Sequence, residues 1–154
     1  MGKVLRLIIC VVGCEAAGFI GSFATAPAIP TWYAGLAKPE FNPPNWIFAP
    51  AWTLLYLLMG VALWLVWEKR GWSAPVLVFL IQLVLNIAWS FIFFGMHLPL
   101  WAFAEIVLLW LMILICTVQF WRVSRIAGAI MLPYLGWVSF AAVLNFAIYS
   151  LNKV

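Results

Sequence analysis

The sequence predicts an all-α integral membrane protein, a bundle of five transmembrane helices, and both composition and segment lengths support this prediction. Hydrophobic residues make up 68% of the 154 residues, charged residues make up 8%, and the mean hydropathy is +1.15. Soluble domains carry about 25% charged residues, and a soluble fold of this length could not bury so much apolar surface. This composition excludes a disordered chain and disfavours an ordinary cytosolic enzyme. We expect residues 1–154 to form a single membrane domain.

Five apolar segments reach the length of about 20 residues that a helix needs to cross a bilayer. They cover residues 5–24, 44–67, 74–94, 99–120 and 127–151. Pro44, Pro75 and Pro99 fall near the predicted helix starts, where a missing N–H costs little. Pro133 falls inside the fifth segment and should bend it. Residues 106–115 are apolar at every position, without the alternation expected of a membrane β-barrel.

The first segment imitates a secretory signal peptide. Lys3 and Arg6 precede a short apolar run, and residues 24–26 (Ala-Thr-Ala) resemble a cleavage site. Glu15, however, lies at the centre of the segment, where the apolar region of a signal peptide would avoid an acid. We therefore predict a permanent first helix.

The distribution of basic residues predicts the orientation of the chain. With five spans, one side of the membrane holds six of the eight basic residues, namely Lys3, Arg6, Lys69, Arg70, Arg122 and Arg125. The positive-inside rule places that side, and the N-terminus, in the cytoplasm. The connection at residues 25–43 and the C-terminus are then expected on the opposite side. Because the net charge of +4 comes from scattered single residues and pairs, we expect no nucleic-acid partner.

The three cysteines and the one histidine predict no metal site. Cys10, Cys14 and Cys116 match no zinc or haem spacing, and His97 stands alone. We interpret the cysteines as small apolar residues of the packed interior.

Residues 32–52 form the most distinctive stretch, with the sequence WYAGLAKPEFNPPNWIFAPAW. Its four prolines fix φ and remove backbone donors, so we predict a stiff connection that is not helical. Its three tryptophans are typical of a belt at the level of the lipid headgroups. The same stretch would also serve as a lid over a pocket between helices, and the residues alone leave both interpretations open.

The chain closely resembles the translocator protein family, also called tryptophan-rich sensory protein or peripheral-type benzodiazepine receptor. The loop carries the pattern W-Y-x-x-L-x-K-P-x-x-x-P-P-x-W-x-F from Trp32, followed by PAWTLLY at residues 50–56. Further matches follow in order: QL-x-LN-x-x-WS from Gln82, FFG from Phe93, PYL-x-W from Pro133, and LN at residues 144–145. The resemblance covers essentially the whole chain.

This resemblance implies a five-helix bundle, often a homodimer, that binds porphyrins such as protoporphyrin IX as ligands rather than as cofactors. In some members the resemblance also implies cholesterol and synthetic drugs as ligands, in a pocket beneath the first loop. The ligand-binding residues implied by motif are Phe48, Ala49, Trp52, Asn86, Trp89, Trp101, Ala104, Leu108, Trp137, Ala141 and Leu144. Helical spacing agrees in part, because the three residues of the fourth segment share one helix face, as do the three of the fifth. Ordinary packing with lipid-facing tryptophans is the alternative for these faces.

Polar residues inside the predicted spans need partners. Gln82, Asn86 and Ser90 lie four residues apart on one face, which favours hydrogen bonds between helices or contact with a ligand. Glu15 is costly, because an acid at mid-bilayer costs about 2.5–3.5 kcal/mol on insertion scales. No basic residue lies at matching depth, so we predict that Glu15 is protonated or hydrogen-bonded within the bundle, with a proton relay as a further hypothesis.

Three functions remain open: porphyrin binding for transport, sensing or stress response; light- and oxygen-dependent porphyrin breakdown; and carriage of lipid or sterol. No residue trio resembles acid–base or nucleophilic machinery, so breakdown would rely on the ligand and on tryptophan redox chemistry, with Trp52 and Trp137 as candidates. Phe146 and Ser150 stand where the family's sterol pattern has an aromatic hydroxyl and an arginine. This departure weakens the case for specific sterol binding.

Overall fold

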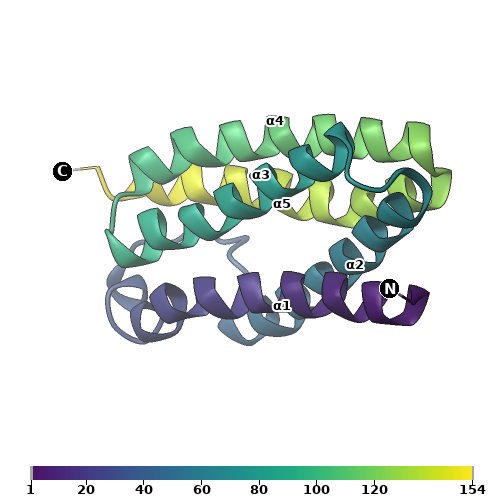
Figure 1. The fold of residues 1–154 in the computed structure, drawn as a ribbon. Helices are drawn as coiled ribbons and strands as arrows, with labels where there is room; N and C mark the ends of the chain where they lie inside the picture. Colours follow the sequence, from purple (N-terminus) through teal and green to yellow (C-terminus); the bar gives the residue numbers. More distant parts are fainter. Residues whose placement is uncertain (1, 154) are drawn as a thin grey trace.

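The computed structural model describes residues 2–153, and within that range it contains helices and no strands (Figure 1). The five long helices are α1 (Lys3–Ala28), α2 (Asn45–Arg70), α3 (Ala74–Ser90), α4 (Pro99–Val123) and α5 (Arg125–Leu151). A short 3-10 helix, η1, covers Tyr33–Gly35, and a π-helical turn, η2 (Phe91–Gly95), extends α3. All five helices are long and apolar enough to cross a membrane. The predicted all-α architecture of five spans is confirmed.

The first connection is shorter than the sequence predicts, and part of it is helical. α1 continues four residues beyond the predicted end at residue 24, and Pro27 lies inside the helix. The helix end is stabilised because the Thr31 hydroxyl donates to the free carbonyl of Pro27 at 2.7 Å. The connection was also predicted to be non-helical, but η1 forms one helical turn within it. Pro133 does not interrupt α5, which runs through it to Leu151.

The helices form a closed ring in which each packs against two neighbours. Around the ring the order is α1, α2, α5, α4 and α3, and α3 packs back against α1. Figure 1 shows α2 running obliquely across the bundle, whereas α1, α4 and α5 run nearly parallel to one another. The buried residues of α2 all lie between Leu55 and Val66, in the middle and the second half of the helix. α2 therefore fills the centre of the bundle at one end and leaves space at the other.

The packed half of the bundle is dense and aromatic. Phe79 of α3 and Phe120 of α4 stack with their ring centroids 5.7 Å apart, and neither side chain is exposed. Met59 of α2 and Ile113 of α4 are also fully buried in this half. Interiors of this density contain few open spaces. The open space beside the first half of α2 is therefore a feature of the other half of the bundle.

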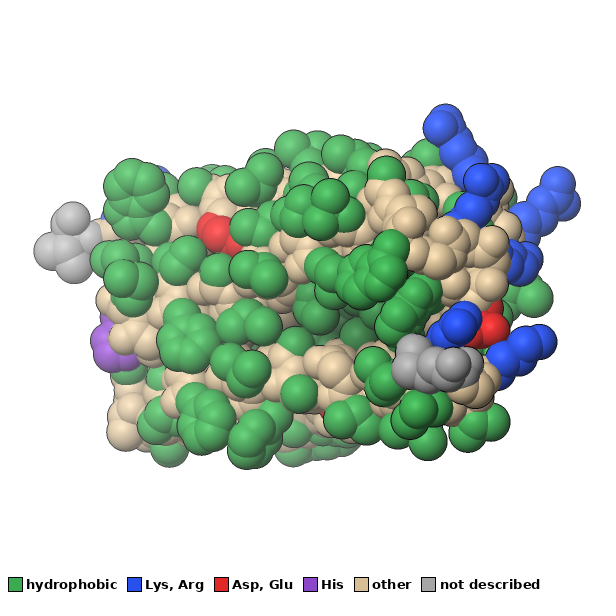
Figure 2. Space-filling model, in the orientation of Figure 1, with side chains coloured by type: hydrophobic (Ala, Val, Ile, Leu, Met, Phe, Trp, Pro, Cys, Tyr) green, Lys and Arg blue, Asp and Glu red, His purple; other side chains and the backbone are tan. Residues whose placement is uncertain are grey.

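Charges gather at one end of the molecule. Figure 2 shows most of the Lys and Arg side chains at the end where the N-terminus lies, and hydrophobic side chains over the long sides. At this end Arg6 of α1 and Glu68 of α2 form an ion pair with a nitrogen–oxygen distance of 2.9 Å. The apolar sides and the basic end suit a protein embedded in a bilayer.

α1 and α2 approach each other closely at Gly60, and this contact yields a prediction about stability. A Cβ atom at Gly60 would lie 2.6 Å from the Cα atom of Val11, so the two backbones would have to separate. We expect Gly60→Ala to lower the free energy of unfolding by about 1–3 kcal/mol, as overpacking does. Thermal unfolding in detergent micelles measures this change.

Gly136→Ala is the matched control, because a Cβ at Gly136 of α5 meets no atom within 4 Å. Alanine is favoured over glycine inside a helix by roughly 1 kcal/mol, so this variant should be neutral or more stable. Equal destabilisation by both substitutions would contradict the close α1–α2 crossing.

Candidate ligand cavity

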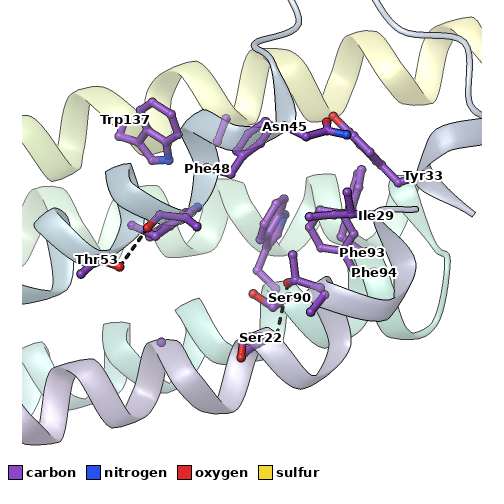
Figure 3. Close-up of a pocket in the computed structure, with 18 of the residues that line it drawn as sticks. Ser22, Ile29, Tyr33, Asn45, Phe48, Thr53, Ser90, Phe93, Phe94 and Trp137 are labelled. Carbon is purple, nitrogen blue, oxygen red and sulfur yellow. Dashed lines mark hydrogen bonds between the residues drawn. The ribbon is translucent and has the colours of Figure 1, made fainter. Parts of the chain in front are cut away.

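A cavity of about 420 Å³ lies between α1, α2, α3 and α5, beneath the connection at residues 29–44 (Figure 3). Its volume falls within the range of small-molecule sites, about 300–1,000 Å³. η1 and η2 complete its wall, and α4 contributes no residue to it. The cavity occupies the space that the oblique course of α2 leaves open.

One wall of the cavity is built from aromatic rings of α2 and α5. Trp52 and Trp137 meet edge to face with their centroids 6.4 Å apart, and Phe48 meets Trp137 in the same way at 6.3 Å. Tyr56 follows Trp52 one turn later, with its ring centroid 5.6 Å away. Such edge-to-face pairs hold the rings in fixed orientations, so this wall presents a preformed aromatic surface.

The opposite wall depends on the π-helical turn at the end of α3. Trp89 and Phe93 stack with their centroids 5.2 Å apart, and Phe94 meets Phe93 edge to face at 4.8 Å. The wider turn places both phenylalanines, as well as Trp89 and Ser90, along the cavity. π-helical turns inside longer helices are frequent at functional sites.

The connection at residues 29–44 forms the roof of the cavity and is held in place at several points. Trp32 stacks on His97 with a centroid distance of 4.3 Å. Asn152, at the end of α5, forms two hydrogen bonds with the backbone of Ala37, at 3.0 and 2.9 Å. The Tyr33 hydroxyl donates to Asn42 Oδ1 at 2.8 Å, and burial raises the pKa of Tyr33 above its ordinary value. The roof is therefore an ordered lid.

A buried hydrogen-bond network closes the cavity at its inner end. The Tyr56 hydroxyl donates to Asn86 Oδ1, and the Asn86 amide donates to the Tyr134 hydroxyl at 2.9 Å. Tyr134 in turn donates to Gln82 Oε1 at 2.8 Å. This chain joins α2, α3 and α5 where all four side chains are buried. Polar groups in a membrane interior need such internal partners.

Asn145 of α5 anchors a second set of hydrogen bonds at the cavity wall. It accepts from the indole Nε1 of Trp89 at 3.1 Å and donates to the carbonyl of Pro99 at 2.8 Å. Because these bonds join α5 to both α3 and the start of α4, they fix the orientation of Trp89 toward the cavity.

The structure gathers seven of the eleven residues named from the sequence around this cavity. They are Phe48, Ala49, Trp52, Trp89, Trp137, Ala141 and Leu144. Asn86 is 2% exposed and belongs to the network beneath the cavity rather than to its wall. Of the polar face on α3, only Ser90 reaches the cavity, while Gln82 and Asn86 join helices to one another.

The three residues named on the fourth segment lie elsewhere. Trp101 and Leu108 are 67% and 50% exposed, and Ala104 is exposed between them on the outer face of α4. Their helical spacing does define one face, but that face points away from the bundle because Ala102, Ile106 and Leu109 occupy the inner face. Helical spacing alone shows that residues share a face, but it does not show whether that face is turned toward the bundle or away from it.

Sequence reasoning missed most of the α1 contribution to the cavity. Glu15, Gly18, Ser22 and Thr25 line it, together with Tyr33 from the roof. These α1 residues recur at helical intervals and are small or polar, a signal that was present in the sequence. Among residues 2–153, no three histidine, cysteine or acidic side chains come close enough to hold a metal ion.

Comparison with known proteins identifies the family of this chain. Residues 10–151 match the model of the TspO/MBR family. A tryptophan-rich protein TspO of Archaeoglobus fulgidus is 46% identical over 97% of this chain and 99% of its own. The protein of the same name from Chlorobaculum tepidum is also 46% identical, over 97% of this chain and 98% of its own. The human translocator protein is 36% identical over 92% of this chain and 84% of its own.

Five apolar helices, four of which line an aromatic cavity, define a polytopic membrane protein with an internal chamber. Since the family model and relatives at 36–46% identity span nearly the whole chain, the protein belongs to the TspO/MBR family.

The buried network predicts a loss of stability on removal of one hydroxyl. Tyr134→Phe should leave both Asn86 and Gln82 short of a partner within the bundle. Hydrogen bonds between membrane helices average about 0.6 kcal/mol each, so we expect a loss of roughly 1 kcal/mol in the free energy of unfolding. Thermal unfolding in micelles tests this, with Tyr149→Phe as control, because Tyr149 at the end of α5 takes no part in the network. An unchanged Tyr134→Phe variant would contradict the role of the network.

Proposed function

We propose that the protein binds a porphyrin of the protoporphyrin IX type in this cavity, for transport, sensing or a stress response. The observation that carries the proposal is the pair of aromatic walls. Trp52 of α2, Trp137 of α5 and Trp89 of α3 all line the cavity, and most of its other lining residues are apolar. A flat, apolar macrocycle gains both area burial and ring stacking in such a space.

The expected affinity follows from the size of the ligand and the shape of the site. A ligand with roughly forty non-hydrogen atoms, at about −0.3 kcal/mol per atom, has a ceiling near −12 kcal/mol. The cavity contains few fixed polar groups to orient the ligand, so binding well short of that ceiling is expected, at about −8 kcal/mol or micromolar Kd.

Light- and oxygen-dependent breakdown of the bound porphyrin is a second candidate function. The observation in its favour is that two indoles, Trp52 and Trp137, meet at the cavity wall, where they would contact the ligand directly. The chemistry would then belong to the excited ligand and to tryptophan as electron donor, and the protein would position the two.

Replacing Trp52 or Trp137 by Phe separates the two candidates. Phenylalanine keeps an aromatic face, so porphyrin affinity should fall only about two- to fivefold, as for a modest loss of stacking. Light-driven turnover, which would need an indole, should fall to the background rate. Fluorescence titration measures the first property, and product analysis after illumination measures the second.

Trp64→Phe is the control for this pair. Trp64 also lies on α2, but its indole donates to the carbonyl of Lys3 at 3.2 Å, outside the cavity. If all three variants bind porphyrin like the parent, the cavity is not the porphyrin site. If the parent leaves the porphyrin unchanged under light, the protein is a binder and not an enzyme.

We also propose that the basic end of the bundle faces the cytoplasm and the roof faces the opposite side. The support is the charge distribution, because Arg6 at the start of α1, Lys69 at the end of α2 and Arg122 at the end of α4 belong to the same set of helix ends. Figure 2 shows most of the Lys and Arg side chains gathered at one end of the molecule. Single cysteines at Ala37 and Lys69, in a background without the three native cysteines, should react with an impermeant maleimide from opposite sides. Both positions are exposed, so equal labelling from one side would contradict the proposed topology.

A further inference from the structure

Glu15 is the only charged side chain among the described residues that line the cavity. The remaining lining residues are aromatic, aliphatic, small or neutral polar, and none is Lys, Arg or His. Within residues 2–153 the Glu15 carboxylate forms no hydrogen bond and no ion pair. The cavity therefore carries one acid and no compensating base.

Glu15 marks the inner end of the cavity, far from the roof. It lies 12 residues from the first residue of α1 and 13 from the last, and at about 1.5 Å per residue this is close to the middle of the helix. One turn along, α1 passes so close to α2 that a Cβ at Gly18 would lie 2.5 Å from the Tyr56 ring. Gly18 and Tyr56 both line the cavity, and no lining residue of α1 precedes Glu15, so its carboxyl group lies at the end of the cavity away from the roof.

An acid at this depth needs a partner that the protein does not supply. Glu68 has Arg6 within 2.9 Å, at the polar end of the bundle. The elements that pack against α1 are α2, α3 and η2, and their basic residues, Lys69 and Arg70, lie at that same end. The cost of an isolated carboxyl group in the membrane is offset when a cation binds next to it.

We propose that Glu15 forms a subsite for a protonated amine at the inner end of the cavity, and that the cavity prefers planar aromatic ligands with a cationic group at that end. The inference rests on the proposed function, because it takes the aromatic cavity to be the ligand site. It adds that the two ends of the site differ in the charge they favour, with cations favoured at the inner end. Carboxylates of a porphyrin would be repelled from Glu15 and would face the roof, where Lys38 lies over the ring of Tyr33 at 4.7 Å.

Two porphyrins that share the same macrocycle but differ in the charge of their side chains test the proposal. Binding is measured in an uncharged detergent. The neutral probe is protoporphyrin IX dimethyl ester, and the cationic probe is the bis-amide of protoporphyrin IX with N,N-dimethylethylenediamine. The parent protein should bind the cationic probe about tenfold more tightly than the ester, as expected for one hydrogen bond between charged groups. Glu15→Gln should reduce the advantage of the cationic probe over the ester to about twofold or less.

Glu105→Gln is the matched control. Glu105 is also an acid inside a predicted span, on α4, and it does not line the cavity. This variant should keep the full preference for the cationic probe. If the ester binds but the parent shows no preference, or if Glu15→Gln keeps the preference, the proposed subsite is wrong while the aromatic site stands. If neither probe binds the parent, both proposals are overturned.

Discussion

The hydrogen bonds among Tyr56, Asn86, Tyr134 and Gln82 are the interaction on which the rest of the structure depends. They join α2, α3 and α5 at one level of the bundle, in a region where no water competes for the same groups. Apolar side chains gain little by leaving lipid for a protein interior, so helix association in membranes relies on close packing and internal hydrogen bonds. On one side of this level the helices pack densely, and on the other side they separate around the cavity.

The division of the bundle follows from what each half of α2 offers its neighbours. The second half carries Gly60, which lets α1 approach closely, and buried residues on every side that faces the bundle. The first half carries Phe48 and Trp52, whose rings cannot fill the wider space and so line it instead. An oblique helix that allows close backbone contact at Gly60 and presents flat rings at Phe48 and Trp52 thus produces a core and a chamber in the same bundle.

The sequence predicts the five spans from local signals, and the family resemblance names four of the aromatic residues at the cavity, namely Phe48, Trp52, Trp89 and Trp137. Apolar length identifies the helices, and the motif around Trp52, Trp89 and Trp137 identifies rings that the structure places at the cavity. The sequence does not predict whether Trp101 and Leu108 face the bundle or the outside. Helical spacing shows that two residues share a face, but only the neighbouring helices decide which face is buried. The α1 residues that line the cavity were missed for a related reason. Small and polar residues on a helix face are as consistent with close packing between helices as with the wall of a cavity.

α4 lines no part of the cavity, yet it helps to set the geometry of the aromatic walls. Its Trp110 donates to Ser139 of α5 at 2.7 Å, and the Pro99 carbonyl at its start accepts from Asn145 at 2.8 Å. Asn145 also holds the indole of Trp89. α4 therefore fixes the rotation of α5, and through Asn145 the position of a ring on the opposite wall. The spacing of the walls is thus set by hydrogen bonds that reach beyond the cavity, so its shape is a property of the whole bundle rather than of its lining residues alone.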